Sequence, residues 1–205
     1  MMAGNGFNEF PLKILEVQHH IRSRRLLIRR LRVEDVNDDY VRWMNDPETT
    51  KYLEVRFSKL TRQDIEKYVR CNLSNHSSTW HLGVFDRSGD RLVGTVTFNH
   101  IDYHHRSAAI SFVIGYPDTR GRGYATEAVH AATFHMFHDA GFIKLWGGYY
   151  ADHAASARVF RKNGYRIEGR LKGKLVNYRG ERVDHVYVGL LREKFLPNKE
   201  FLEAG

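Results

Sequence analysis

The feature that most constrains this chain is a glycine-rich turn with the sequence Arg120-Gly121-Arg122-Gly123-Tyr124-Ala125-Thr126. The residues before it, 108–115, read as a strand, and residues 124–140 after it read as a helix. Glycines allow positive φ and close approach of a ligand, and the first turn of a helix leaves N–H groups without partners. The arrangement predicts a phosphate site at the helix start, with charge added by Arg120 and Arg122. A basic surface turn with convenient glycines is the alternative.

The length of 205 residues predicts one folded domain with a sizeable core. We expect an N-terminal extension at residues 1–23, the domain at 24–195 and a C-terminal tail at 196–205. The net charge of +8 permits acidic partners such as nucleic acid or an acidic coenzyme. The single cysteine, Cys71, cannot form an internal disulfide, no apolar run reaches membrane-span length, and no secretory signal is recognised. We therefore expect a cytoplasmic protein with no membrane partner.

Hydrophobic periodicity predicts a mixed α/β fold. Strands are expected at residues 26–31, 80–85, 91–101, 108–115, 145–150, 165–176 and 183–191, and helices at 36–44, 61–73, 124–140 and 155–163. The helix between the strands at 108–115 and 145–150 implies a parallel crossover.

Further motifs accompany the turn in a characteristic order. They are Arg42-Trp43-Met44-Asn45-Asp46-Pro47 upstream, and His153-Ala154-Ala155-Ser156, Lys162-Asn163-Gly164-Tyr165 and Glu168-Gly169 downstream. Together with residues 117–128 they resemble the GNAT (GCN5-related) N-acetyltransferase family, and most closely its Rim-type ribosomal-protein acetyltransferase branch. The resemblance spans about residues 25–195. It implies the GNAT fold, a mixed and largely antiparallel central sheet with one parallel, splayed strand pair, flanked by helices.

The resemblance implies acetyl-CoA as the cofactor, with its pyrophosphate on the turn, and no metal. A pantetheine arm is a chain of amides, so it can pair with the exposed edge of the strand before the turn. The residues expected to bind the cofactor are Phe112, Val113, Ile114, Arg120, Gly121, Arg122, Gly123, Tyr124, Ala125, Thr126, His153, Ser156 and Phe160.

Acetyl transfer to an amine requires a group that protonates the leaving thiolate. Many GNAT enzymes use a tyrosine where this chain has Phe160, whereas the Rim branch assigns the role to the serine that matches Ser156. Ser156 is therefore the predicted general acid. The alternative is that Ser156 caps the short helix that follows it.

The base is harder to assign, because the branch often has Glu where this chain has Ala109. His153 also stands where the family usually has Asn. A hairpin turn near residues 103–106 would place His100 opposite Ala109 on the same face of the sheet, and imidazole suits a base at neutral pH. His100 is the predicted base. The rivals are His81, His104, His105 and a base-free mechanism through ordered water.

We therefore expect an N-acetyltransferase whose acceptor is a primary amine of a protein N-terminus, an aminosugar nucleotide, a polyamine or an amine antibiotic. Its predicted acceptor-binding residues are Trp43, Asn45, Tyr52 and Phe57, and the protein is expected to be a monomer or homodimer. One alternative is a catalytically silent acyl-CoA-binding module, which Ala109 and Phe160 would suit. Another is a basic nucleic-acid-binding protein, although no aromatic-basic pattern typical of RNA binding stands out.

Overall fold

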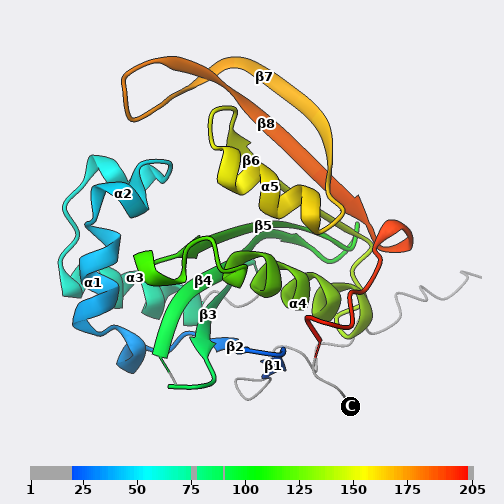
Figure 1. The fold of residues 1–205 in the computed structure, drawn as a ribbon, viewed down its shortest axis with the longest axis horizontal. Coiled ribbons are helices and arrows are strands. Elements are labelled where there is room, and N and C mark those ends of the chain that lie inside the picture. Colours follow the sequence, from blue (N-terminus) through cyan, green and yellow to red (C-terminus); the bar gives the residue numbers. More distant parts are fainter. Residues whose placement is uncertain (1–19, 75–77, 90, 203–205) are drawn as a thin grey trace, which may run out of the picture.

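Eight strands form one sheet in the order β1-β2-β3-β4-β5-β6-β8-β7 (Figure 1). This computed structural model describes residues 20–74, 78–89 and 91–202; most of the predicted extension, 1–19, and the end of the predicted tail, 203–205, lie outside it. All strand pairs are antiparallel except β5 with β6, so the predicted mixed, largely antiparallel sheet is confirmed. The strands are β1 Ile21–Arg22, β2 Leu26–Arg30, β3 Trp80–Asp86, β4 Arg91–Asp102, β5 Ser107–Ile114, β6 Lys144–Tyr150, β7 Arg166–Val176 and β8 Arg182–Leu191.

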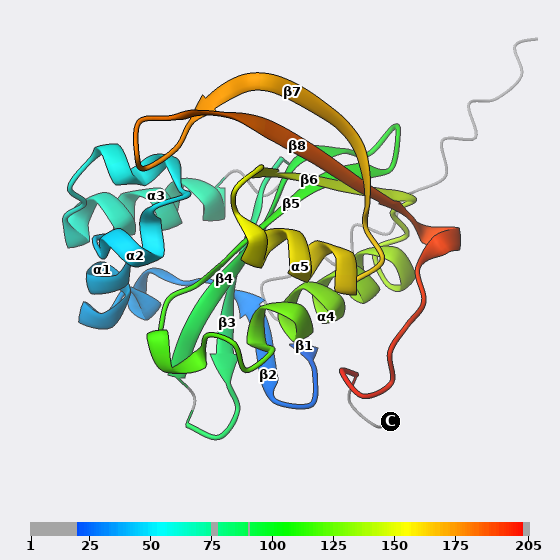
Figure 2. The same cartoon turned by 45° about the horizontal axis from the view of Figure 1, so that its top comes forward.

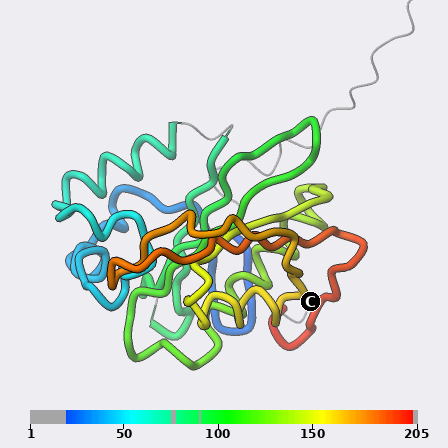
Figure 3. The backbone as a smooth tube through the Cα atoms, turned by 90° about the horizontal axis from the view of Figure 1, so that it is seen from above, coloured from blue at the N-terminus to red at the C-terminus, as the bar shows by residue number. Residues whose placement is uncertain are grey.

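Helices cover both faces of the sheet, as the view from above shows (Figure 3). The α-helices are α1 Asp38–Met44, α2 Pro47–Thr50, α3 Arg62–Ser74, α4 Tyr124–His138 and α5 Ala154–Lys162. Short 3-10 turns are η2 Val33–Asp35, η3 Glu54–Phe57, η4 Pro117–Thr119 and η5 Arg192–Lys194. Helices α4 and α5 lie on one face, and α1, α2 and α3 lie on the other. None of the helices in the described ranges is long and apolar enough to cross a membrane.

Two apolar clusters hold the helices to the sheet. The larger one, between the sheet and α4–α5, includes Phe98, Ile110 and Met136. The smaller one, under α1 and α3, includes Trp43 and Val69. Each fully buried side chain of this size stabilises the fold by about 1.5–3 kcal/mol. The glycine-rich turn between β5 and α4 is thereby attached to two rigid elements.

The parallel pair β5–β6 is short. Residues Ser107, Ala108 and Ala109 pair with Lys144, Leu145 and Trp146, and no later residue of β5 pairs with β6 among those described. The rest of β5 stays on β4, whereas β6 stays on β8 along its whole length. The sheet therefore divides into two parts that diverge toward α1 and α2, with the β7–β8 hairpin on the upper part (Figures 1 and 2).

The chain ends of the described region differ from the sequence prediction. Residues 21–23 were expected in the extension, yet Ile21 and Arg22 pair with β2, and Ser23 is fully buried and bridges to Leu202. A strand of two residues is too short to leave a detectable periodicity. The predicted boundary at residue 24 therefore excludes a piece of the sheet.

Candidate active site

The glycine-rich turn has the backbone that a phosphate site requires. Gly121 has φ of 74° and Gly123, the N-cap residue of α4, has φ of 83°. The first-turn N–H groups of α4 have no intrahelical partner, and the helix dipole adds partial positive charge there. A Cβ on Gly121 would meet nothing within 4 Å, so there is room beside the exposed backbone. Residues 120–126 therefore fit the pyrophosphate of acetyl-CoA.

A buried carboxylate holds this turn from behind. Glu127 is 1% exposed and accepts hydrogen bonds from the Arg25 backbone N–H and Nε, both at 2.7 Å, and from the Ser23 hydroxyl at 2.8 Å. Arg25 Nη1 donates to the carbonyl oxygen of Arg122 at 3.0 Å, and its guanidinium lies 4.5 Å from the ring centroid of Tyr124. We call this the Arg25–Glu127 clasp. Sequence reasoning missed it, and a glutamate on the buried side of an apolar helix was the available signal.

Replacing Glu127 with glutamine should loosen the clasp. One amide oxygen cannot accept from every donor that the carboxylate holds, so a buried donor loses its partner and the free energy of unfolding falls by about 1–3 kcal/mol. Coenzyme affinity should fall as well, because the carbonyl of Arg122 loses its anchor. Urea denaturation and calorimetric titration with CoA measure the two effects.

The control for Glu127→Gln is Asp35→Asn. Asp35 pairs with Arg29 at 2.7 Å on the opposite face of the sheet, so its loss should lower stability without changing CoA affinity. Equal CoA affinities for Glu127→Gln and the parent would leave the clasp with a purely structural role.

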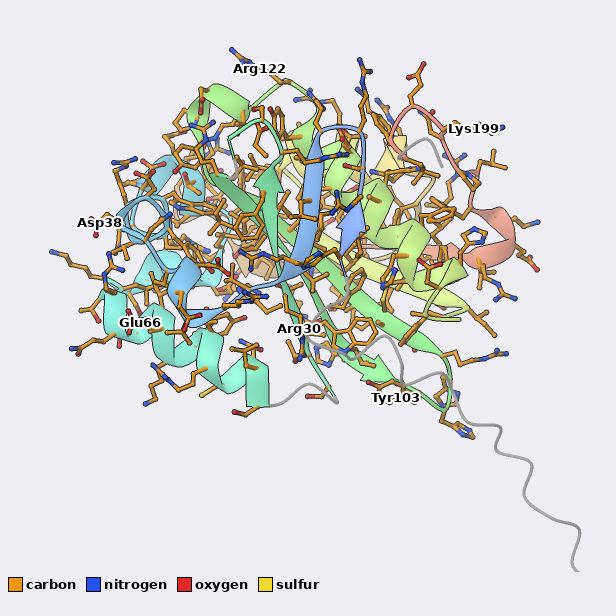
Figure 4. The ribbon with its side chains drawn as sticks, turned by 90° about the horizontal axis from the view of Figure 1, so that it is seen from below. Arg30, Asp38, Glu66, Tyr103, Arg122 and Lys199 are labelled. Atoms are coloured by element: carbon orange, nitrogen blue, oxygen red, sulfur yellow. The ribbon has the colours of Figure 1, made fainter. Side chains whose placement is uncertain are left out.

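The two arginines of the turn have different contacts. Arg120 Nη2 donates to the Thr49 hydroxyl at 2.6 Å and lies 3.6 Å from Asp46 Oδ2, so it ties the turn to α2. Arg122 is exposed and points into solvent (Figure 4), and no described side chain pairs with its guanidinium. Arg122 is thus the cation of the turn that is free to meet a phosphate, whereas Arg120 would have to share its charge with Asp46.

Arg122→Ala should therefore weaken CoA binding by about tenfold at low salt and by less at high salt, since an exposed cation acts through screened attraction. Arg120→Ala should show the same salt-dependent loss of CoA affinity and, in addition, a loss that salt does not change, because this substitution also releases α2. Arg161→Ala, an exposed arginine on α5, is the control and should leave affinity unchanged. Titration of CoA at two salt concentrations gives the result, and a loss for Arg122→Ala that salt does not alter would contradict phosphate contact.

Two consecutive glycines of β6 lie where β5 departs. A Cβ on Gly147 would lie 2.8 Å from Phe160 Cζ and 2.8 Å from the carbonyl oxygen of Ile110. A Cβ on Gly148 would lie 2.2 Å from His185 Nε2. Successive residues of a strand face opposite ways, so a ring presses on each face of this short segment. Only glycine leaves space for both rings.

Ser156 and Phe160 lie one turn apart on the buried face of α5. Phe160 packs on the rings of Phe112 and Tyr149, with centroids 5.5 and 6.1 Å away, so three residues around the strand gap come together. Ser156 is 7% exposed, and its hydroxyl makes no hydrogen bond to any described residue. The N-cap of α5 is His153, which makes no side-chain cap bond. The alternative that Ser156 caps the helix is therefore wrong, because Ser156 is already the third residue of α5.

The predicted cofactor residue His153 meets the predicted acceptor residue Tyr52. Their rings stack with centroids 4.1 Å apart, which joins the loop before α5 to the loop after α2. Burial lowers the pKa of His153 to about 4; Asp152 opposes this shift and Lys51 adds to it. His153 is therefore neutral at pH 7, and one face of its ring is occupied by Tyr52.

Two other predicted acceptor residues are engaged in packing. Trp43 is 4% exposed and lies against Gly115, whose Cβ would be 1.6 Å from the indole ring. The Asn45 amide donates to the carbonyls of Val41 and Leu60 and accepts from the Leu60 N–H. These contacts do not support an acceptor-binding role for Trp43 or Asn45. Phe57 is 70% exposed and carries the Arg56 guanidinium 4.1 Å from its ring centroid.

The predicted position of His100 is wrong by one residue. Asn99, and not His100, lies opposite Ala109, because a β-bulge interrupts the β4–β5 pairing after Asn99. His100 occupies this bulge with φ of 49°, is exposed, and stacks on Trp146 with ring centroids 5.7 Å apart. The sequence pattern carries no sign of a bulge, which adds one unpaired residue to the strand.

The other histidines that were considered as bases lie elsewhere. His81 is buried, and its ring nitrogens contact the Tyr40 hydroxyl at 3.3 Å and the Thr97 hydroxyl at 2.7 Å. Burial lowers the pKa of His81 to about 4. His104 and His105 lie in the β4–β5 turn, beside Tyr103, at the end of the sheet away from Arg122 (Figure 4).

A row of rings that sequence reasoning missed crosses β6 and β8 on the face away from α5. Centroid distances are 5.7 Å from His100 to Trp146, 6.2 Å from Trp146 to Tyr187 and 4.3 Å from Tyr187 to His185. His185 ends the row over Gly148. The alternating pattern of the last strand, with His185 and Tyr187 two residues apart, was the available signal.

Comparisons with known proteins agree with these features. Residues 25–166 match the model of the acetyltransferase (GNAT) domain. The probable N-acetyltransferase YjcK of Bacillus subtilis is 33% identical over 115 residues, which are 55% of this chain and 61% of that protein.

Solved structures show the same fold. A GNAT-family acetyltransferase from Bacillus anthracis has a TM-score of 0.73 and 25% identity, covering 85% of this chain and 99% of that one. Spermidine N-acetyltransferase from Vibrio cholerae, solved with CoA and spermine, has a TM-score of 0.72 and 20% identity, covering 83% and 97%. Because the family model matches most of the described residues, from Arg25 of the clasp to Arg166 at the start of β7, the chain belongs to the GNAT acetyltransferases and is an acetyl-transfer enzyme.

Proposed function

We propose that this enzyme transfers the acetyl group of acetyl-CoA to a primary amine. The observation that carries the proposal is the parting of β5 from β6 beside the glycine-rich turn. Strand β5 loses its partner after Ala109, and its other end leads into the turn at residues 120–123. A coenzyme with its pyrophosphate on the turn would extend its pantetheine arm along β5 toward this gap.

The edge of β5 supports the same placement. Phe112, Val113 and Ile114 pair with β4 on one edge, and no described strand pairs with them on the edge facing β6. Backbone polar groups away from water require partners, and the amides of pantetheine can supply them as an added strand would.

Acetyl-CoA would supply a thioester carbonyl for the amine nitrogen to attack. A C–N bond would form, the C–S bond would break, the nitrogen would release a proton to water and the sulfur would take one. Ser156 is the proposed donor of that proton, because its hydroxyl has no partner among the described residues and shares a helix face with Phe160. Backbone N–H groups on the unpaired edge of β5 would polarise the thioester carbonyl oxygen.

The acceptor would enter on the face away from α5. Tyr150 lies there, with its hydroxyl bonded to Glu54 and 3.0 Å from Arg56 Nη1. The Tyr52 ring lies between two others, with its centroid 5.6 Å from that of Tyr150 and 5.6 Å from that of Tyr178. Charges of both signs line this face. The similarity to spermidine N-acetyltransferase from Vibrio cholerae supports a polyamine as the acceptor. The resemblance to the Rim-type branch supports a protein N-terminus instead.

An amine panel tests the proposal. Spermidine, a peptide with a free N-terminus, an aminosugar nucleotide and an aminoglycoside would each be incubated with acetyl-CoA while thiol release is followed. Cys71 is exposed, so its thiol would also react with the reagent that detects CoA, and a Cys71→Ser background removes this contribution. We expect acetylation of at least one of these amines. Coenzyme binding without transfer to any of them would contradict the proposal.

The second candidate is a catalytically silent acyl-CoA-binding module. It is favoured by Phe160 and Ala109, which bring no proton-transfer group to two positions beside the gap. It predicts tight acetyl-CoA binding with no turnover in the same panel.

A further inference from the structure

A histidine outside every family motif lies at the point where β5 and β6 part. His185 on β8 is directly opposite Tyr150 on β6, so the two side chains share a face of the sheet. Its Nε2 lies where a side chain on Gly148 would be, 2.2 Å from the position of a Cβ there. Gly148 follows Trp146, the last residue of β6 that pairs with β5, by two positions. The imidazole therefore covers the segment of β6 that β5 has left.

The groups on the two faces of this segment are complementary. Gly147 accommodates Phe160 from α5, whereas Gly148 accommodates His185 from β8. Ser156, the proposed acid, is on the α5 side. A base on one face and an acid on the other would let an amine approach from β8 while the sulfur leaves toward α5.

The ring nitrogens of His185 lack partners. Nδ1 is buried without a hydrogen bond, and no described residue hydrogen-bonds to Nε2. A buried polar atom without a partner is rare and calls for a water or a ligand. The three buried histidines among the described residues differ in this respect. His81 contacts Tyr40 and Thr97, His130 contacts Asn163 and the Asn198 N–H, and His135 contacts Asp139. His185 is thus free to accept a proton from outside the protein.

Burial, together with the charge of Lys174, keeps the His185 imidazole neutral. Burial lowers its pKa from the ordinary value of 6.5, the ammonium of Lys174 on β7 lowers it further, and Glu54 from η3 opposes both. The other titratable or charged groups on this face are Tyr187, whose hydroxyl accepts from Lys174 Nζ at 3.1 Å, Tyr150 with Arg56 Nη1 3.0 Å from its hydroxyl, and His100 at the far end of the row. At pH 7 the imidazole is therefore mainly the free base.

We propose that His185 is the general base for the acceptor amine. This inference rests on the proposed acetyl transfer. Its imidazole takes a proton from the acceptor ammonium, so that an N–H bond of the ammonium breaks, an N–H bond forms on the ring, and the freed lone pair can attack; the proton then passes to water. Burying the ammonium among the rings of the row lowers its own pKa, which eases the transfer.

His185→Gln is the test, with spermidine and a free-N-terminus peptide as acceptors. Loss of a positioned base should lower kcat/KM by about 10²–10⁴-fold with CoA affinity unchanged. In the parent, kcat/KM should rise with pH through a pKa below 6.5 and then level off. In the variant it should rise by about tenfold per pH unit through neutrality, because only the neutral fraction of the amine reacts. His138→Gln, an exposed histidine at the end of α4, should match the parent.

Two measurements do not depend on turnover. In the NMR spectrum of the free enzyme, the His185 resonance is identified as the imidazole signal that is absent from His185→Gln. This signal should titrate with a pKa below 6.5, and it should shift when spermidine is added. A ring that titrates at the ordinary value and ignores the amine would overturn the proposal. Urea denaturation confirms that the variant is folded.

The outcomes distinguish a failure of the proposed acetyl transfer from a failure of the base role of His185. A parent that acetylates no amine overturns the proposed function, and the base role with it. An active parent, with His185→Gln within threefold of it and the same pH profile, overturns the base role alone and favours ordered water. Loss of the pH-dependent limb in His100→Gln but not in His185→Gln would reassign the role to His100.

Discussion

Valine at position 123 should abolish coenzyme binding in a protein that still folds. Gly123 is the N-cap of α4 with φ of 83°, a conformation that a β-branched residue adopts only under strain. The strain is of order 1–3 kcal/mol, which a domain of this size tolerates. Its relief requires the turn to move, and the amides at the start of α4 would no longer converge on one phosphate. Calorimetric titration with CoA should show no binding, and circular dichroism should show the native fold.

Gly121 offers a sharper version with a matched control. Gly121 and Gly180 both have positive φ, 74° and 80°, and a Cβ on either would meet nothing within 4 Å. Alanine therefore imposes the same backbone strain at both positions in the free protein. Valine at Gly121 or Gly123 perturbs the turn more strongly than alanine does. Alanine at Gly121, compared with alanine at Gly180, separates the loss of ligand contact from the backbone strain. A loss of CoA affinity in Gly121→Ala that is absent from Gly180→Ala would come from the coenzyme itself.

If Gly121→Val and Gly123→Val bind CoA like the parent, the turn is not the pyrophosphate site. The basic surface turn would then be the correct account of residues 120–126.

The fold was predictable because its signals are local. Strand and helix periodicity, the stop at Asn45-Asp46-Pro47 and the glycines at 121 and 123 all act within a few residues. The helix between two strands then required a parallel crossover, which the β5–β6 pair confirms. The hydrophobic periodicity of the sequence could not show where the pairing between neighbouring strands is interrupted. The bulge at His100 and the two-residue strand at Ile21 are decided by packing against neighbouring strands.

The glycine-rich turn of the candidate site was predictable from the sequence, whereas its contacts with distant residues were not. The turn is one continuous segment, so its residues are visible in the sequence. The Arg25–Glu127 clasp joins positions 102 residues apart, and His185 reaches Gly148 across the sheet. Such contacts depend on strand order and register, which the residues alone do not specify. The packing of Trp43 was not predictable for the same reason: this tryptophan, beside a predicted binding loop, lies against Gly115.

Ser156→Ala should lower kcat while leaving coenzyme affinity and stability almost unchanged. A positioned acid contributes typically 10²–10⁴-fold, and a thiol with a pKa of roughly 8.5 is a good enough leaving group to place the effect at the lower end. If Ser156 capped the helix, its replacement by alanine would instead lower the free energy of unfolding by about 1 kcal/mol. The structure removes that outcome, because the hydroxyl of Ser156 caps nothing in α5 and alanine favours the helix. Single-turnover rates at saturating acceptor, with urea denaturation in parallel, measure the two quantities.

Phe160→Tyr provides the complementary change. The Cζ atom of Phe160 faces Gly147 at the strand gap, so a phenol oxygen added there would enter the gap from the same helix face as Ser156. Overpacking should cost about 1–3 kcal/mol, since Phe160 is 1% exposed. If both positions adjoin the sulfur, Phe160→Tyr should restore at least part of the kcat lost in Ser156→Ala. A kcat for Ser156→Ala within about twofold of the parent, with chemistry rate-limiting, would remove Ser156 from the mechanism, and solvent would then be the source of the proton on the thiol.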